Sequence, residues 1–319
     1  MVTPSTSTAY PSGLRAASSG HLLRIAADGG PRVGYGHVGR CLALCEAMLG
    51  AAAFTVPGPA VGEFLRTRGM PVTDVDEAPI VLLDGAEPTS AVTVRGLQDR
   101  GRRVVLLDDL GDGRTVADLV IDPPTAALWP PAGGRRLAGF EHVLLRREVR
   151  AADRSDPAGE VLLALGGSDP TGLTPPLAAA LVAAGVQLAV NFGPGYGARR
   201  DVPGRLLDDP GAFPSALVAA RLLVASYGHT LLEAAYLGVP AIIVVTRPDQ
   251  LEHATAFARA GTAAIVDMSG GARPDELAVT VRELLADDAR LRTLAARGPE
   301  LVDGRGAERV AAAIRSLVE

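Results

Sequence analysis

Short apolar runs alternate with amphipathic helical patterns along most of the chain, in two successive series. The first series has helical patterns after His37 and around Phe64 and Leu97, and its apolar runs lie at 22–27, 52–56, 80–83 and 103–107. In the second series the apolar runs lie at 161–165, 187–192, 222–225, 241–245 and 263–266. Continuous apolar strands between such helices are typical of parallel sheets covered on both faces. We therefore expect an α/β protein in which two doubly wound, Rossmann-like domains face a cleft.

The 319 residues are enough for two domains of ordinary size, and 48% of them are hydrophobic, which suffices for two cores. Residues 1–20 are rich in Ser, Thr, Ala and Pro without an apolar period and predict a disordered tail. A polar stretch at 146–159 reads as the linker between the two domains. We expect an N-terminal domain at 21–150, a C-terminal domain at 151–305, and a final amphipathic helix at 306–319 that crosses back to the first domain.

Charge and cysteine content narrow the functional class. The net charge is -5 and all 31 basic residues other than histidine are arginines, so no basic face suggests a nucleic-acid partner. Two cysteines are too few for disulfides to stabilise a fold of this size, and we expect no signal peptide, since the first residues show no charged segment followed by an apolar one. These features predict a cytoplasmic enzyme with no membrane span, and they leave the oligomeric state open.

A glycine-rich strand-to-helix turn at 32–40 carries the first candidate site, with Gly36, His37 and Arg40. Free backbone N–H groups at such a turn favour an anion, and the positive helix end favours a neutral imidazole that can act as a base. The turn also fits the G-x-G-x-x-G string of dinucleotide-binding proteins, but the second strand is followed by 57–59, Pro-Gly-Pro, where those proteins need a carboxylate. We therefore expect no nicotinamide or flavin cofactor. Arg40 has three interpretations: contact with a diphosphate, an ion pair with an acid such as Glu63, or a place on the surface, which is the commoner one for arginine.

Aspartates follow several strands of the first series: Asp28, Asp84, Asp108 and Asp109. Ligands of open parallel sheets bind at the carboxyl ends of the strands, so these acids are placed to hold a sugar hydroxyl or to orient His37. Capping of the next helix explains each of them equally well. A Pro-rich loop at 123–131 holds the lone Trp129, which either covers an acceptor or packs on the domain edge.

Two loops of the second series resemble phosphate-binding and ribose-binding elements. Gly166, Gly167 and Ser168 follow a strand, and their small size lets backbone amides approach a pyrophosphate. The segment 225–233 begins at the end of the apolar run 222–225, and its Glu233 is either a ribose ligand or a partner of the helix dipole.

His37, Cys41 and Cys45 recur every four residues and share one helix face, a spacing that would suit a zinc site. The cysteines lie among Leu and Ala residues, where small buried thiols are common. We interpret them as core residues and expect no metal.

Four ordered motifs between His21 and Val266 resemble one known family, the PseG group, which contains a UDP-sugar hydrolase and is related to MurG-like glycosyltransferases of the GT-B fold. The motifs are Gly34-x-Gly36-His37-Val38-x-Arg40-Cys41-Leu42-x-Leu44, the segment 165–170, Ser226-x-Gly228-x-Thr230-x-x-Glu233, and Asp249-Gln250 with Ala254 and Gly261. The resemblance implies a GT-B-like fold with acceptor and catalysis in the first domain and the nucleotide sugar in the second.

By the same resemblance His37 would be the base, and Glu233 would bind the ribose. Gln250 would contact the donor sugar, and Gly167, Ser168, Ser226 and Thr230 would hold the diphosphate. The further substrate-contacting candidates are Gly36, Arg40, Asp28, Asp108, Gly166, Gly228, His229 and His253. The chain departs from many relatives at Tyr227, His229 and His253, where the donor or acceptor would lie, so the resemblance does not fix the sugar.

These observations predict a glycosyltransferase that uses a UDP-sugar donor and a small-molecule acceptor, without a metal. In-line attack by an activated acceptor would invert the anomeric centre, and no retaining carboxylate pair is evident. Nucleoside-antibiotic enzymes such as cytosylglucuronate synthase are similar, so the expected setting is natural-product or surface-glycan biosynthesis. The alternatives are a PseG-type hydrolase that releases UDP and free sugar, and a nucleotide-sugar binding protein without turnover.

Overall fold

A computed structural model describes residues 20–30, 33, 35–55, 58–74, 77–122, 124–125, 129–152, 159–166, 169, 171–192, 201–207 and 212–319. The predicted tail at 1–20 lies outside these residues except for Gly20, as do residues 153–158 of the predicted linker. Gly167 and Ser168 also lie outside them.

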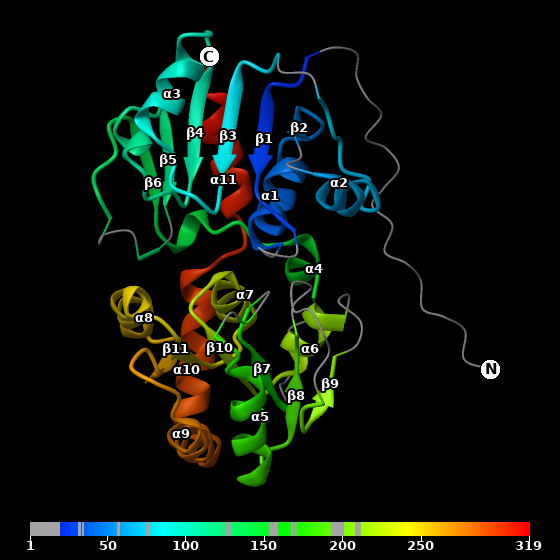
Figure 1. Cartoon of the computed structure of the whole chain (residues 1–319), viewed down its shortest axis with the longest axis vertical. Coiled ribbons are helices and arrows are strands. Elements are labelled where there is room, and N and C mark those ends of the chain that lie inside the picture. The colour runs from blue at the N-terminus through cyan, green and yellow to red at the C-terminus, as the bar shows by residue number, and fades with distance from the viewer. Residues whose placement is uncertain are drawn as a thin grey trace, which may run out of the picture.

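The first sheet has six parallel strands in the order β2-β1-β3-β4-β5-β6 (Figure 1). The strands are β1 (Leu23–Ala27), β2 (Ala52–Thr55), β3 (Ile80–Asp84), β4 (Arg103–Leu107), β5 (Leu119–Asp122) and β6 (Arg135–Ala138). The connecting helices are α1 (Gly36–Ala47), α2 (Pro59–Arg66) and α3 (Ala91–Gln98), with the 3₁₀ turns η1 (Asp112–Thr115) and η3 (Phe140–His142). The short helix α4 (Arg147–Arg150) leads into the second half of the chain.

The second sheet also has six parallel strands, in the order β12-β11-β10-β7-β8-β9. Its strands are β7 (Val161–Ala164), β8 (Leu188–Val190), β9 (Arg205–Leu206), β10 (Leu222–Ser226), β11 (Ala241–Val245) and β12 (Ala263–Asp267). Its helices are α5 (Thr174–Ala183), α6 (Phe213–Ala219), α7 (His229–Leu237), α8 (Pro248–Arg259), α9 (Pro274–Ala286) and α10 (Asp288–Leu301). The chain ends in α11 (Gly306–Arg315). The predicted fold class, two doubly wound α/β units, is confirmed.

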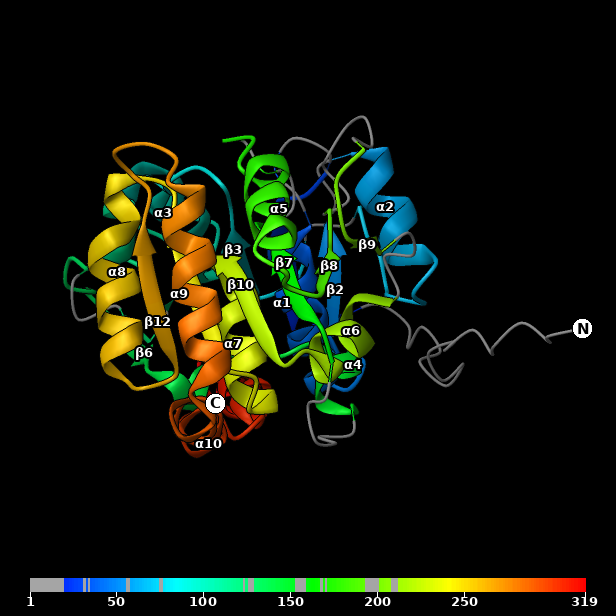
Figure 2. The ribbon, with the colours of Figure 1, turned by 90° about the horizontal axis from the view of Figure 1, so that it is seen from below.

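Helices cover both faces of each sheet, which explains why the strands are apolar throughout. In the second sheet α5 and α9 run side by side over one face (Figure 2), while α6, α7 and α8 contribute to the core on the other. In the first sheet α1 and α2 cover one face and α3 the other.

The last helix, α11, packs against α1 in the first unit rather than in the second, where the preceding helices lie (Figure 1). Val310 and Ile314 are fully buried in the first core, and Arg315 donates from Nη2 to the carbonyl oxygen of Ala47 at 3.0 Å. The chain therefore passes between the units twice.

Every apolar run predicted as a strand forms one, with ends shifted by one or two residues. Three further strands, β5, β6 and β9, were not anticipated. β6 carries two exposed arginines on the sheet edge, and β9 has only two residues, so neither shows an apolar pattern. Among the described residues no helix is both long and apolar enough to span a membrane.

Candidate functional site

Each sheet has a topological switch point, between β1 and β3 in the first and between β7 and β10 in the second. Ligands of open parallel sheets bind beside such points, because the flanking loops there diverge to opposite faces. The His37 turn follows β1, and the two candidate loops of the second unit follow β7 and β10. Sequence motifs and topology thus select the same loops.

A cavity of about 120 Å³ lies between the two units, and we call it the cleft cavity. The first unit contributes Arg40 from α1 and Asp108 from the end of β4, and the second contributes Gly228 and His229 at the start of α7. Apolar side chains fill much of its wall: Leu107, Ile121, Val143, Leu144, Leu232 and Phe257. The predicted cleft therefore exists and brings residues of both units together.

His37 stands in the first turn of α1, directly after the exposed Gly36. Its Nδ1 lies 2.6 Å from Oδ1 of Asp84, the last residue of β3. Asp84 is fully buried, whereas the His37 side chain keeps 24% of its surface exposed. We assign the proton to Nδ1, because an ionised carboxylate only accepts, and this leaves the lone pair on Nε2. The geometry is that of a histidine base oriented by a buried aspartate.

Arg40 completes a network with two aspartates. It donates to Asp84 from Nε (2.8 Å) and Nη2 (2.5 Å), and from Nη1 to Oδ2 of Asp108 (2.5 Å). Arg40 Nη2 also lies 3.2 Å from His37 Nδ1, which is a contact rather than a hydrogen bond because both nitrogens carry protons. The expected ion pair with an acid therefore forms, but its partners are Asp84 and Asp108 rather than Glu63, whose described ion pair is with Arg66. The alternative of a surface arginine is wrong, since the Arg40 side chain is only 12% exposed.

In this network the charged groups shift the pKa values of their neighbours. Burial alone would raise the pKa of Asp84, but the charge of Arg40 and hydrogen bonds from Arg40 and His37 hold that pKa well below its usual range. Burial would lower the pKa of Arg40, but Asp84 and Asp108 raise it further above its usual value. Asp84 therefore stays ionised and Arg40 stays charged, so the aspartate can stabilise a protonated His37.

The other two predicted aspartates, Asp109 and Asp28, bind backbone amides instead. Asp109 accepts hydrogen bonds from the backbone N–H groups of Thr89 and Gly111, so it holds a loop together. Asp28 accepts from the backbone N–H of Ala86 at 2.9 Å and lines a second cavity beside β1 and β3. Of the four predicted acids, one orients His37, one pairs with Arg40, and Asp28 and Asp109 bind backbone amides.

In the second unit the glycine loop and the start of α7 converge. Gly166 has a φ of +95°, which favours glycine, and a Cβ there would lie 3.6 Å from Oγ of Ser226 at the end of β10. The helix after this loop begins at Thr174, where the Asp169 carboxylate accepts from the backbone N–H groups of Leu173 and Thr174. Thr230 follows His229 in the first turn of α7.

Glu233 lies one turn into α7 and is only 1% exposed. Both its oxygens accept from Arg146, which comes from the segment between the units: Nε donates at 2.6 Å and Nη2 at 2.7 Å. Such a bidentate pair links the two halves of the chain. Arg146 is the first residue of the stretch predicted as the linker. Its partner was not predicted, because 87 residues separate the two.

His229 faces the cleft cavity with an unused nitrogen. Its ring is hydrogen-bonded to the backbone of Leu144, while Nε2 has no partner among the described residues. Burial lowers the pKa of His229, and although Glu233 raises it, Arg40 and Arg146 lower it further. The ring is therefore neutral at physiological pH.

A chain of hydrogen bonds crosses the cleft beside the cavity. Trp129 Nε1 donates to His253 Nε2 at 3.3 Å, because an indole N–H can only donate. His253 Nδ1 then carries the ring proton and donates to Thr125 Oγ1 at 3.0 Å. The Thr125 hydroxyl also forms a hydrogen bond of 2.8 Å with Tyr227 Oη. Trp129 thus contacts the second unit. Thr125 was not predicted as a site residue, because no motif in the neighbouring sequence indicates it.

Gln250 lies in the first turn of α8, outside the residues that line the cleft cavity. Its Oε1 accepts from the backbone N–H and the hydroxyl of Thr246, so it stabilises the loop before the helix. Its amide nitrogen has no role in those two bonds.

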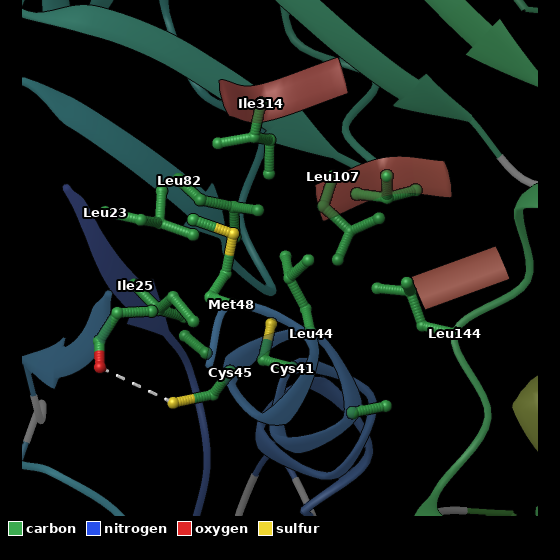
Figure 3. Close-up of a cluster of buried hydrophobic side chains, with 14 of the residues drawn as sticks. Leu23, Ile25, Cys41, Leu44, Cys45, Met48, Leu82, Leu107, Leu144 and Ile314 are labelled. Atoms are coloured by element: carbon green, nitrogen blue, oxygen red, sulfur yellow. Dashed lines mark hydrogen bonds between the residues drawn. The ribbon is translucent and has the colours of Figure 1, made fainter. Parts of the chain in front are cut away.

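Cys41 and Cys45 are buried in the first core, as expected (Figure 3). The Cys41 thiol donates to Asp84 Oδ2 at 3.3 Å, and the Cys45 thiol donates to the carbonyl oxygen of Ala52 at 3.7 Å. Burial raises the pKa of Cys45 to about 12 and that of Cys41 well above its usual value. In the described part of the chain, no three His, Cys, Asp or Glu side chains are grouped to hold a metal.

Comparison with known proteins agrees with this architecture. Residues 214–305 match the Glycosyltransferase family 28 C-terminal domain. The fold is similar to that of MurG from Acinetobacter baumannii, with 17% identity, a TM-score of 0.61, and coverage of 93% of this chain and 100% of that one.

The glycotransferase of kitacinnamycin is similar at 15% identity, with a TM-score of 0.67 and coverage of 93% and 99%. The spinosyn rhamnosyltransferase SpnG is similar at 15% identity, with a TM-score of 0.61 and coverage of 93% and 100%. The chain therefore has the GT-B fold. A comparison with curated proteins gives no match.

Proposed function

We propose that the chain is a glycosyltransferase that moves a sugar from a UDP-sugar to a small acceptor with inversion at the anomeric carbon. The observation that carries this proposal is the His37–Asp84 pair in the first unit, linked through Arg40 to the cleft cavity that the start of α7 lines from the other side. His37 does not itself line this cavity and lies behind Arg40. A base on that side and a helix start on the other match the charges that develop when a glycosyl phosphate bond breaks.

The reaction has one displacement step. His37 Nε2 takes the proton of an acceptor hydroxyl while that oxygen forms a bond to the anomeric carbon. The bond from that carbon to the diphosphate oxygen breaks, and its electron pair leaves on UDP. Asp84 stabilises the resulting imidazolium, and backbone amides at the start of α7 and in the glycine loop stabilise the diphosphate. Residues 165–168 and Ser226, Gly228 and Thr230 are the proposed diphosphate ligands.

Glu233 is the proposed ribose ligand, and it favours UDP over a deoxyribose nucleotide because a carboxylate can accept from both ribose hydroxyls. Arg146 covers this carboxylate in the structure, so nucleotide binding requires Arg146 to share or release it. The structural relatives include SpnG with thymidine diphosphate and a Phytolacca americana enzyme with UDP-2fluoro-glucose and pterostilbene. Both nucleotides are therefore informative probes.

The domain match supports the same assignment, because residues 214–305 include α7 and α8, where the proposed nucleotide ligands lie. One structural relative, SpnG, is in complex with spinosyn aglycone, and a small natural-product acceptor for this chain is consistent with that complex. Gln250 and His253 on α8 are the proposed contacts of the donor sugar.

The test is UDP release from UDP-glucose, UDP-N-acetylglucosamine and UDP-glucuronate, with and without a panel of small acceptors. Release that requires an acceptor supports the transferase. Release at the same rate without an acceptor identifies a hydrolase, and binding without release identifies a binding protein. Tighter binding of thymidine diphosphate than of UDP in calorimetry would refute the role of Glu233.

A further inference from the structure

The cleft cavity has the size of a single ring. Its volume is about 120 Å³, and an engineered cavity of about 150 Å³ lined by Leu, Ile and Phe in another protein binds benzene. Most of the proposed nucleotide-sugar contacts lie outside it, since Ser226, Thr230, Glu233 and Gln250 do not line it. The cavity is therefore left to a ring that belongs to another molecule.

Aromatic side chains form one corner of the cavity beside its aliphatic wall. The His253 ring stacks on Tyr227 with 5.8 Å between the ring centroids and 30° between the planes. Trp129 stands edge-on to His253, with centroids 6.0 Å apart and planes at 89°. All three residues line the cavity, as does Phe257. Such a corner offers both the faces and the edges of rings, and aromatic ligands pack well on either.

Arg114 holds the Trp129 side of this corner in place. It is fully buried, and its Nε donates to the carbonyl oxygen of Pro130 at 2.8 Å. Nη1 and Nη2 donate to the two oxygens of Asp122 at 3.0 and 2.8 Å, and the guanidinium carbon lies 5.5 Å from the centroid of the Trp129 ring. A wall that is ordered before binding spares a ligand the cost of ordering it.

Several polar side chains that line the cavity are already hydrogen-bonded to protein. Asp122 accepts from Arg114 and Arg136, and both nitrogens of His253 are bonded, to Thr125 and Trp129. A ligand hydroxyl that faced these groups or the aliphatic wall would lose its hydrogen bonds to water and gain none. The cavity is therefore unsuited to a ring with hydroxyls on every side.

Asp108 is the exception, because one of its oxygens is open. Its Oδ2 accepts from Arg40, no described bond uses Oδ1, and 31% of the side chain is exposed. Asp108 follows β4 with a φ of +54°, a conformation that costs energy and persists where the surroundings hold it. An ionised carboxylate only accepts, so the ligand group that faces Oδ1 must be an O–H or N–H donor.

We propose that the cleft cavity binds an aromatic ring that carries a hydrogen-bond donor, such as a phenol. The ring packs on the apolar wall, and its O–H group donates to Asp108 Oδ1. Because His37 does not line the cavity, this hydroxyl anchors the ring, and the reacting hydroxyl belongs to another part of the molecule. That the ring belongs to the acceptor rests on the proposed function, whereas the preference for a phenol rests on the cavity alone.

The test is titration of the full chain with phenol, toluene and glucose in the absence of any nucleotide. Toluene has the shape of phenol without the donor, and glucose has a ring of similar size with hydroxyls around it. Ligand-observed NMR gives the affinities, and the fluorescence of Trp129, the only tryptophan of the chain, reports on the cavity.

We expect phenol to change the Trp129 fluorescence and to bind roughly tenfold more tightly than toluene, which corresponds to one hydrogen bond to a charged group. Glucose should bind more weakly than toluene. Equal affinity for phenol and toluene, glucose binding as tight as that of phenol, or phenol binding that leaves the fluorescence unchanged would overturn the proposal.

Asp108→Asn should reduce the preference for phenol over toluene several-fold. Asparagine tolerates a positive φ about as well as aspartate, so the backbone at this position should be kept. The matched control is Asp99→Asn at the end of α3, outside the cavity, which removes the same charge and should leave the preference unchanged. An unchanged preference in Asp108→Asn would also count against the proposal.

Leu232→Phe should fill the cavity and weaken the binding of phenol and toluene alike, because Leu232 lines a space that holds only one ring. Leu251→Phe is its control, since Leu251 lies on α8 with 37% of its surface exposed and does not line the cavity. Unaltered phenol affinity in Leu232→Phe would place the bound phenol elsewhere and overturn the proposal.

Turnover separates this proposal from the proposed function. Tyrosol has a phenolic hydroxyl and a side-chain alcohol, whereas phenethyl alcohol has only the alcohol, so tyrosol should have the lower KM as an acceptor. Selective phenol binding with no UDP release from any nucleotide sugar would refute the glycosyltransferase and keep the ring site. UDP release that requires an acceptor, together with no binding of phenol, would keep the glycosyltransferase and refute the ring site.

Discussion

Replacing Asp84 by asparagine should abolish most of the turnover while leaving UDP binding intact. The carboxylate accepts from His37, from two nitrogens of Arg40 and from the Cys41 thiol. An asparagine offers one oxygen and one NH₂ group. If the oxygen stays with Arg40, the NH₂ group faces His37 Nδ1 and moves the ring proton to Nε2, where the base is needed.

The expected loss follows from this change of tautomer. A positioned general base contributes about 10²- to 10⁴-fold in rate, and the same substitution in the serine-protease triad costs about 10⁴-fold. The variant should also lose stability, because Arg40 is 12% exposed and loses a buried partner. We expect about 3 kcal/mol, the lower end for breaking a buried ion pair, since Arg40 retains Asp108.

The assay measures three quantities on the same preparation: UDP release per folded molecule, UDP affinity by calorimetry, and the free energy of unfolding in urea. Asp109→Asn is the matched control, because Asp109 is also buried at a strand end but binds only backbone amides of its neighbouring loops in the described contacts. It should lose stability and keep its rate. An Asp84→Asn protein that turns over within tenfold of the parent would refute the role of this pair.

Four further outcomes follow from the site. His37→Gln should lose about 10²- to 10⁴-fold in turnover with UDP affinity unchanged, and a fully active variant would exclude His37 as the base. Glu233→Ala should weaken UDP binding by about 1 to 3 kcal/mol, and unchanged calorimetric affinity would remove it from the nucleotide site. Folding lowers the pKa of His229, so the unfolded chain binds more protons, and the free energy of unfolding should fall as the pH drops below about 6.5. In urea titrations His229→Leu should make the free energy of unfolding less dependent on pH, and an unaltered dependence would contradict this. Thr125→Val should break the hydrogen-bond chain and raise the KM for the donor more than it lowers kcat, whereas unchanged kinetics would show that the chain is only structural.

The sequence predicted those parts of the molecule that depend on local pattern. Buried parallel strands need continuous apolar runs, and each run interpreted as a strand became one, but the buried strand β5 carries a short run of the same kind and was missed. The cysteines of α1 were correctly placed in the core because their neighbours on the helix are apolar. The strands β6 and β9 escaped prediction for the converse reason, since an edge strand with exposed arginines and a two-residue strand carry no such pattern.

Contacts between the two units could not be predicted from local sequence pattern. Arg146 reaches Glu233 across 87 residues, and Thr125 reaches His253 across 128. Each contact depends on how the two sheets dock, and a single sequence holds no signal for that geometry. The strand-end aspartates were an intermediate case. Topology placed them at one edge of the sheet, but only the observed network distinguishes Asp84 beside His37 from Asp109 in its loop.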